Sequence, residues 1–124
     1  MATNQCVPFF KPGQDVSGYY PAPAGGKRFV STATGGRGSQ PYTQIAPAAG
    51  PVFGVSSQDA IAGDTHLVFV GGIVPVIAGA NLSPNTQVQV GEGGTAVPLT
   101  TGVAVGYVVA GATTGNAAAI KLYG

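Results

Sequence analysis

The sequence predicts an all-β protein in which a small barrel or two-sheet sandwich follows an extended, proline-rich N-terminal arm. Charged residues make up only 7% of the chain and hydrophobic residues 44%, so long surface helices with solvated faces are hard to build. Seven of the ten prolines lie within residues 1–51. From residue 52 onward, short apolar runs recur between turn signals about every 8 to 12 residues, which is typical of a small barrel or sandwich. At 124 residues, we expect one core.

Residues 1–51 are predicted to be largely extended and irregular. Each proline fixes φ, removes a backbone donor and restricts the residue before it. The stretch KRFVSTAT at 27–34 is the one part of this arm with strand-like composition. The arm also carries six of the chain's ten aromatic residues. That number is too high for a passive solvated linker, so we expect these rings to lie on a surface.

Residues 52–124 are predicted to form the β-barrel body. Strands are expected near 52–57, 66–70, 73–77, 86–90, 95–99, 103–109 and 118–123. In TQVQV at 86–90, strict alternation predicts that Val88 and Val90 face a core while the two glutamines face water. Pro75 has no backbone N–H to donate, so its strand is expected at a sheet edge or with a bulge.

A similar phrase occurs twice in this body. GVSSQDAIAGDTHLVFV spans 54–70 and GYVVAGATTGNAAAIKL spans 106–122. In both, a strand runs into a turn in which glycine supplies a positive φ and Asp or Asn bonds its own backbone. The two copies are therefore interpreted as hairpin units that pack together, with residues 72–99 between them, into one closed or nearly closed barrel.

The inventory of reactive side chains argues against an enzyme. The chain has one His, one Cys and four carboxylates, and His66 has no partner at a spacing suited to a metal site or a triad. Asp59 and Asp64 could together bind calcium, but this hypothesis is weak, because turn geometry alone explains why Asp64 is present. We expect no cofactor and no metal. The lone Cys6 forms no intrachain disulfide and favours synthesis in a reducing cytoplasm.

The same composition excludes two classes of partner. A net charge of +1 makes strong nucleic-acid binding improbable, since that affinity requires clustered cations. The N-terminus lacks the pattern of a signal peptide, and the longest apolar stretch is broken by glycines and proline, so no membrane segment is expected.

The body, with its Ala-Gly-Asp turn before an apolar strand, then TQVQV and later TTGVAVGYVVAGATTGNAAAIKL, resembles the small Gly/Ala/Val-rich head decoration proteins of tailed bacteriophages. The resemblance covers residues 52–124 and is weaker in the arm. It implies a β-barrel or β-tulip-like body that associates as a homotrimer at three-fold and quasi-three-fold positions on the outside of the capsid. It also implies that the arm contacts the major capsid protein.

Together, these features predict a noncatalytic capsid decoration, or cement, protein of the virion, made in the host cytoplasm and stabilising the head against DNA pressure. The arm residues selected for capsid binding are Phe9, Phe10, Lys11, Tyr19, Tyr20, Lys27, Arg28 and Phe29. The alternative is a carbohydrate-binding or host-adhesion module displayed on the virion surface, although the body offers few aromatic residues for it.

Overall fold

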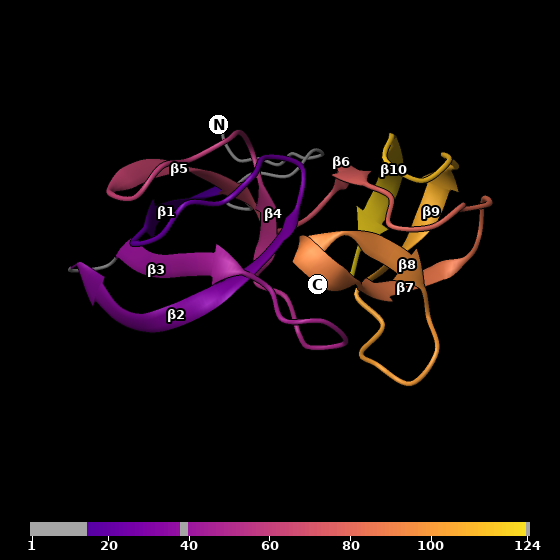
Figure 1. Cartoon of the computed structure of the whole chain (residues 1–124), viewed down its shortest axis with the longest axis horizontal. Helices are drawn as coiled ribbons and strands as arrows, with labels where there is room; N and C mark the ends of the chain where they lie inside the picture. Colours follow the sequence, from indigo (N-terminus) through magenta and orange to yellow (C-terminus); the bar gives the residue numbers. More distant parts are fainter. Residues whose placement is uncertain (1–14, 38–39, 124) are drawn as a thin grey trace, which may run out of the picture.

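The computed structural model describes residues 15–37 and 40–123, which form two β-lobes lying side by side (Figure 1). The first lobe contains β1 (Asp15–Tyr20), β2 (Phe29–Arg37), β3 (Gln40–Ile45), β4 (Gly54–Ser56) and β5 (Asp64–Phe69). The second contains β6 (Ile73–Ile77), β7 (Gln87–Val90), β8 (Ala96–Pro98), β9 (Gly106–Ala110) and β10 (Ala117–Leu122). The predicted all-β class with a barrel is confirmed.

The first lobe is a closed five-stranded barrel with the order β1-β3-β2-β4-β5. All its neighbouring strands are antiparallel except β1 and β3, which pair in parallel at Tyr19 and Tyr42. The second sheet has the order β6-β10-β9-β7-β8. Its two end strands approach each other through a parallel bridge between Ala78 and Ala96. The second lobe therefore comes close to the same closure.

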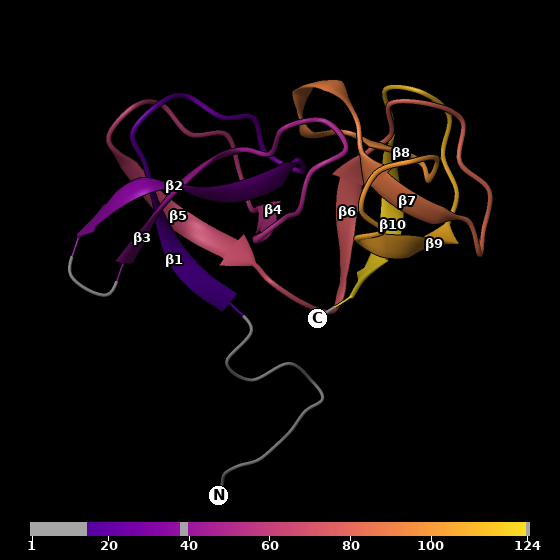
Figure 2. The same ribbon diagram turned by 90° about the horizontal axis from the view of Figure 1, so that it is seen from below.

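The two lobes repeat a single topology. In each, the first strand pairs with the last, the last with the fourth, the fourth with the second and the second with the third. The register also repeats: Val30 lies opposite Gly54 in the first lobe, as Val88 lies opposite Gly106 in the second. The chain is thus a tandem pair of five-stranded units, joined by residues 70–72 (Figure 2).

The repeated phrase is a β-hairpin in both copies, as predicted. The turn glycines, Gly63 and Gly115, have φ values of 94° and 90°. Their N–H groups donate to Tyr20 O and Ala78 O, both at 2.8 Å. The prediction that the copies share one barrel was wrong, because β4 and β5 belong to the first sheet and β9 and β10 to the second. Each hairpin completes its lobe with the strands that precede it.

Residues 15–45 are not an irregular arm, so this prediction was also wrong. They supply β1, β2 and β3, and the predicted boundary after residue 51 falls inside the first barrel. Glycine hides the alternation of β1, because Gly18 is an inward position whose Cβ would come 2.8 Å from Cγ2 of Thr43. Residues 1–14 of the predicted arm lie outside the described residues.

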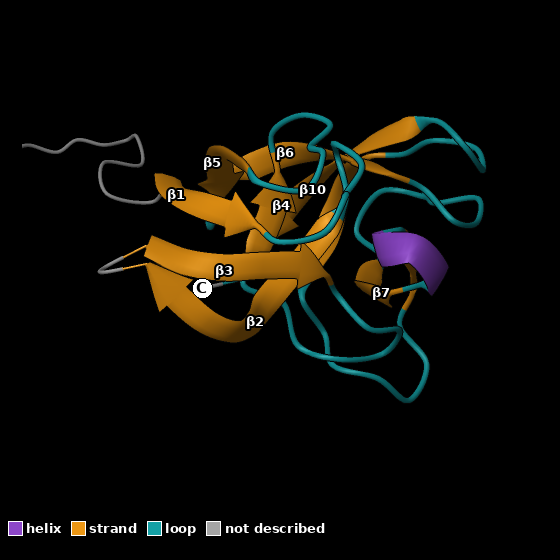
Figure 3. Cartoon of the chain, turned by 60° about the vertical axis from the view of Figure 1, so that its left-hand side comes forward, coloured by secondary structure: helices purple, strands orange, loops and turns teal. Residues whose placement is uncertain are grey.

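The predictions for the second lobe were accurate. Val88 and Val90 are buried in the core, and β6, which contains Pro75, is an end strand of its sheet. The GEGG segment after β7 forms a short 3₁₀ turn (Glu92–Gly94) that leads into β8 (Figure 3).

Two buried clusters hold the molecule together. The smaller one fills the first barrel with Tyr20, Ala24, Val30, Ala60 and Val68. The larger one combines the interior of the second lobe with three residues of the first, namely Phe29, Ala46 and Val55. The lobes are also joined by backbone hydrogen bonds from Ile77 N to Lys27 O and from Ala49 N to Val90 O, both 2.8 Å. The two lobes therefore share a core.

Candidate functional site

A cleft of about 500 Å³ opens where the two lobes meet. Its walls come from the β1–β2 loop at residues 25–28, the β4–β5 loop at residues 57–59, and Ile77 at the end of β6. We call this the interlobe cleft. It contains Lys27 and Arg28, two of the residues selected from the sequence for partner binding.

The β1–β2 loop is held against the end of β4 by polar groups of Ser56. The hydroxyl of Ser56, which is almost fully buried, donates to Gly25 O at 2.6 Å and accepts from Arg28 N at 3.2 Å. Lys27 N donates to Ser56 O at 3.0 Å. Buried polar groups are costly unless paired, so this network fixes the position of the loop.

Two glycines of the β1–β2 loop lie where a larger residue would collide, Gly26 with the β4–β5 loop and Gly25 with Arg28 of its own loop. A Cβ on Gly26 would lie 2.8 Å from Cα of Gln58, and one on Gly25 would lie 2.9 Å from Nε of Arg28. Gly26 N donates to Asp59 Oδ1 at 2.7 Å. Sequence reasoning did not select Gly25, Gly26, Gln58 or Asp59 as cleft residues. The Gly-Gly pair immediately before Lys27 was the available signal.

The two cations of the cleft are held differently. Arg28 is partly buried, and its Nη1 donates to Gly93 O of the second lobe at 3.0 Å. Lys27 is exposed and has a φ of 57°, a left-handed conformation that L-residues rarely adopt. Neither side chain forms a salt bridge with a carboxylate of the described residues.

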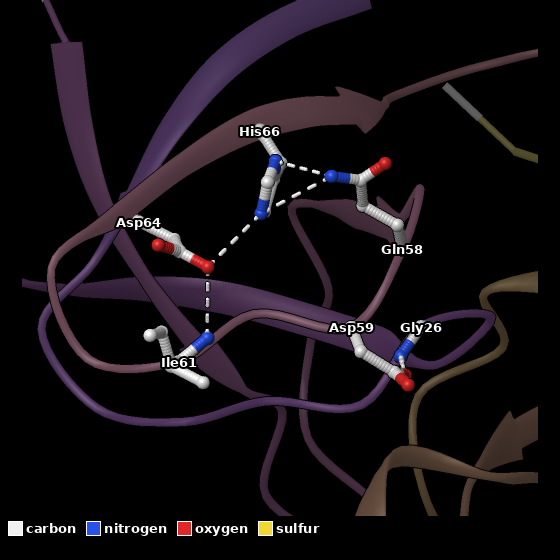
Figure 4. Close-up of polar contacts among 6 residues, drawn as sticks. All are labelled: Gly26, Gln58, Asp59, Ile61, Asp64 and His66. Atoms are coloured by element: carbon white, nitrogen blue, oxygen red, sulfur yellow. Dashed lines mark hydrogen bonds and ion pairs between the residues drawn. The ribbon is translucent and has the colours of Figure 1, made fainter.

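His66 has two polar partners, Asp64 and the cleft residue Gln58 (Figure 4). Its Nε2 lies 3.2 Å from Asp64 Oδ2, and its Nδ1 lies 2.7 Å from Gln58 Nε2. A carboxylate accepts and an amide nitrogen donates, so the geometry places the donor nitrogen of the ring at Nε2, facing Asp64, and the acceptor at Nδ1, facing Gln58. The sequence analysis considered only metal-site and triad partners for His66 and did not anticipate these two hydrogen bonds. Both partners are on the same hairpin.

Asp64 is tied to its turn. Its Oδ2 accepts from Ile61 N at 3.0 Å, and this bond is the largest cause of the lowered pKa of the carboxyl group; desolvation opposes it, and the contact with His66 lowers the pKa further. Asp59 and Asp64 each bond a backbone N–H. Within residues 15–37 and 40–123, no group of three His, Cys, Asp or Glu side chains is arranged to hold a metal ion.

The other residues selected from the sequence occupy different environments. Tyr20 and Phe29 are 0% exposed, so they offer no surface to a partner, and naming them as contact residues was wrong. Burial raises the pKa of Tyr20. Tyr19 is half-buried, with its ring centroid 4.8 Å from that of Tyr42. Phe9, Phe10 and Lys11 lie outside the described residues.

The structure thus brings Lys27 and Arg28 together in one cleft and separates them from Tyr20 and Phe29, which are core residues. The described part of the chain has no helix long and apolar enough to span a bilayer.

Comparison with known proteins gives a fold relationship. No protein-family model matches the chain, and no curated protein matches its sequence. Among solved structures, the chain is similar to the N base of head fiber gp8.5 of bacteriophage phi29. The TM-score is 0.75 at 20% sequence identity, and the match covers 88% of this chain and 92% of that one. The two proteins share a fold across both lobes.

Proposed function

We propose that this protein is a structural component of a phage head, and specifically a decoration protein that binds the outer surface of the capsid and stabilises it. The observation that carries the proposal is the two-lobed fold shared with a phage head fiber base over 88% of the chain. The proposed partner is the major capsid protein. The proposed assembly is a homotrimer at three-fold and quasi-three-fold positions, joined to the virion after synthesis in the host cytoplasm.

Such a role needs no catalytic group. A protein that binds only the intact shell shifts the disassembly equilibrium in proportion to its occupancy. Modest affinity per copy is sufficient when each copy bridges neighbouring subunits, because the second contact forms at high effective concentration. The rigid core shared by the lobes suits a protein that must resist mechanical load.

The proposed capsid contacts are now divided between two places. Phe9, Phe10 and Lys11 belong to residues 1–14, the part of the predicted arm that precedes β1. Lys27, Arg28 and Tyr19 lie within the described lobes, and the Lys27 side chain is exposed.

The test mixes the purified protein with undecorated heads and images them by electron microscopy. Full-length protein is expected to occupy three-fold positions and to raise the temperature at which the heads break open. A variant lacking residues 2–14 is expected to stay folded and lose binding. The deletion stops there because β1, from Asp15, pairs with both β3 and β5.

The matched control replaces Phe9 and Phe10 with serine and leaves the length unchanged. We expect this variant to bind about as weakly as the deletion if the rings supply the contact. Saturation of heads by the deletion variant would overturn the role of the arm. Failure of the full-length protein to bind any head would overturn the function.

A glycan-binding role has one observation in its favour. Tyr107 and Tyr123 lie with ring centroids 6.2 Å apart, and Gln87 Nε2 donates to the Tyr123 hydroxyl at 2.9 Å. Aromatic rings beside a polar group are a common arrangement for binding small polar ligands. Binding of the full chain to a glycan array, lost in Tyr123→Ala, would favour this second function.

A further inference from the structure

We propose that the interlobe cleft binds a carboxylate side chain from an acidic segment of a protein partner. The identity of that partner as a head surface protein rests on the proposed function, whereas the chemistry of the cleft does not. The proposal depends on the charge of the cleft, the conformation of Lys27 and the fixed position of Arg28.

The cleft is basic at its open side. Lys27 and Arg28 contribute two positive charges, and Asp59 is the one acidic residue in its lining. The Oδ1 atom of Asp59 already accepts the short hydrogen bond from Gly26 N. One carboxylate from outside would balance the remaining charge, and a charge-assisted hydrogen bond to lysine or arginine is stronger than a neutral one.

Lys27 stands in a conformation that glycine adopts more readily. Its φ of 57° falls in the left-handed region, where a non-glycine residue carries strain. Its backbone is nevertheless held there on both sides, since Lys27 N donates to Ser56 O and Lys27 O accepts from Ile77 N. The fold requires this backbone position, and it gains nothing from a lysine side chain there. What the side chain adds is an exposed ammonium group at the mouth of the cleft.

Arg28 is oriented before any partner arrives. Its single hydrogen bond to Gly93 O anchors the guanidinium to the second lobe, and a guanidinium has five N–H donors. A preoriented cation loses less conformational entropy on binding. The cleft therefore combines one cation held by a hydrogen bond with one exposed cation.

The small number of cations decides the class of ligand. Nucleic-acid affinity grows with the number of phosphates neutralised, and two cations with one adjacent carboxylate are too few for it. An acidic protein segment needs only one or two carboxylates at this site. Such a segment would also contact the loops at residues 25–28 and 57–59, which line the cleft.

The test titrates the ¹⁵N-labelled full chain with an acetylated hexaglutamate peptide and follows backbone amide shifts. Saturable shifts are expected at residues 25–28. Lys27→Gly should weaken binding by about tenfold, the size expected for one hydrogen bond to a charged group. Its melting temperature should stay equal or rise, because glycine relieves the strain. If Lys27→Gly binds the peptide more weakly but is equally stable, the Lys27 side chain acts in binding and not in folding.

Lys121→Gln is the matched control, because it removes the same charge from an exposed position on β10. It should bind as the parent does, and hexaglutamine should produce no shifts. Unchanged affinity in Lys27→Gly, equal weakening in Lys121→Gln, or tighter binding of a hexathymidylate of equal length would each overturn the proposal.

The same variants separate this inference from the proposed function. If full-length protein decorates heads and Lys27→Gly does so equally well, the cleft is not the capsid contact, and the assignment of its partner to the head surface fails. If the peptide binds the cleft but no head is decorated, the proposed function fails and the carboxylate site stands.

Discussion

The two lobes follow the same strand path but fill their interiors with different residues. Where the first lobe has Tyr20 and Ala24, the second has Ala78 and Leu82. These pairs are equivalent because each makes the same backbone bonds to the hairpin of its own lobe. In the first lobe the large residue precedes the small one, and in the second lobe the small residue comes first. Cores tolerate such changes when the total volume is kept, so the topology does not depend on any one core residue.

What the lobes do share is backbone geometry. Gly54 and Gly106 occupy equivalent positions, where a Cβ would collide with the carbonyl oxygens of Phe69 and Lys121 respectively. Gly63 and Gly115 supply equivalent positive φ angles. The comparison teaches that glycines at turns and at close strand contacts define this unit more strictly than its apolar residues do.

The lobes also differ at one pair of positions that controls their union. Phe29 of β2 pairs with Val55 and is buried in the shared core. Its equivalent, Gln87 of β7, pairs with Tyr107 and is exposed. At this position the first lobe therefore has an apolar residue that packs against the second lobe. The second lobe has a polar residue that faces water.

The largest expected effect is at this junction. Phe29→Ala should lower the free energy of unfolding by about 4 kcal/mol, as for a buried aromatic side chain. Chemical denaturation followed by intrinsic tyrosine fluorescence would measure it. Gln87→Ala, the equivalent change in the second lobe, should cost less than about 0.5 kcal/mol. Equal losses in the two variants would show that the lobes do not depend on a shared core.

Gly54→Ala and Gly106→Ala test whether the two units obey the same backbone constraint. Each added methyl group meets a carbonyl oxygen across the strand pair, so each should destabilise the protein by about 2 kcal/mol. Thermal unfolding measured by circular dichroism would compare them. A tolerated alanine in one lobe alone would show that the close strand approach matters in only one unit.

Gly63→Ala and Gly115→Ala address the turns, where the space for a Cβ is open and only the positive φ resists it. Each should cost about 1 kcal/mol. Asparagine at either position should cost less, because it tolerates the left-handed conformation. A neutral effect of alanine in melting experiments would contradict the role of φ in these hairpins.

The smallest effect concerns pH. The folded-state pKa of Asp64 lies below its ordinary value, so its contribution to stability is present above the unfolded-state pKa and is lost as pH falls through the folded one. Asp64→Asn mimics Asn116 and should remove this acid-sensitive part. Melting temperatures recorded from neutral pH to about pH 2 would show a shallower decline. An unchanged decline would assign the acid sensitivity to other groups.

Local signals in the sequence were enough for part of this structure. Three signals each act within a few residues: the alternation of TQVQV, the repeated Gly-Asp/Asn turns and Pro75. The strands between residues 52 and 123 and both hairpins were therefore predictable. The strand DVSGYY was not, because Gly18 interrupts its apolar face. The prolines of residues 1–51 also favoured the prediction of an irregular arm, although most of the prolines in the described region lie outside the strands.

The candidate site was only half predictable for a related reason. Lys27 and Arg28 stood out as adjacent cations, but Phe29 beside them had an equal claim as an exposed aromatic anchor. Burial depends on what packs against a residue, and here that is the second lobe. Gln58 and Asp59 carry no local mark of belonging to a cleft.

By itself, the sequence determined the β class, the paired hairpins and the scarcity of reactive groups, because composition and short-range periodicity express these directly. Only the tertiary structure decided that the repeat marks two five-stranded units instead of one barrel, that Tyr20 and Phe29 are core residues, and that a basic cleft lies between the lobes. Those features arise from contacts between residues far apart in the chain. Many sequences satisfy such contacts equally well, as the exchanged core residues of the two lobes show.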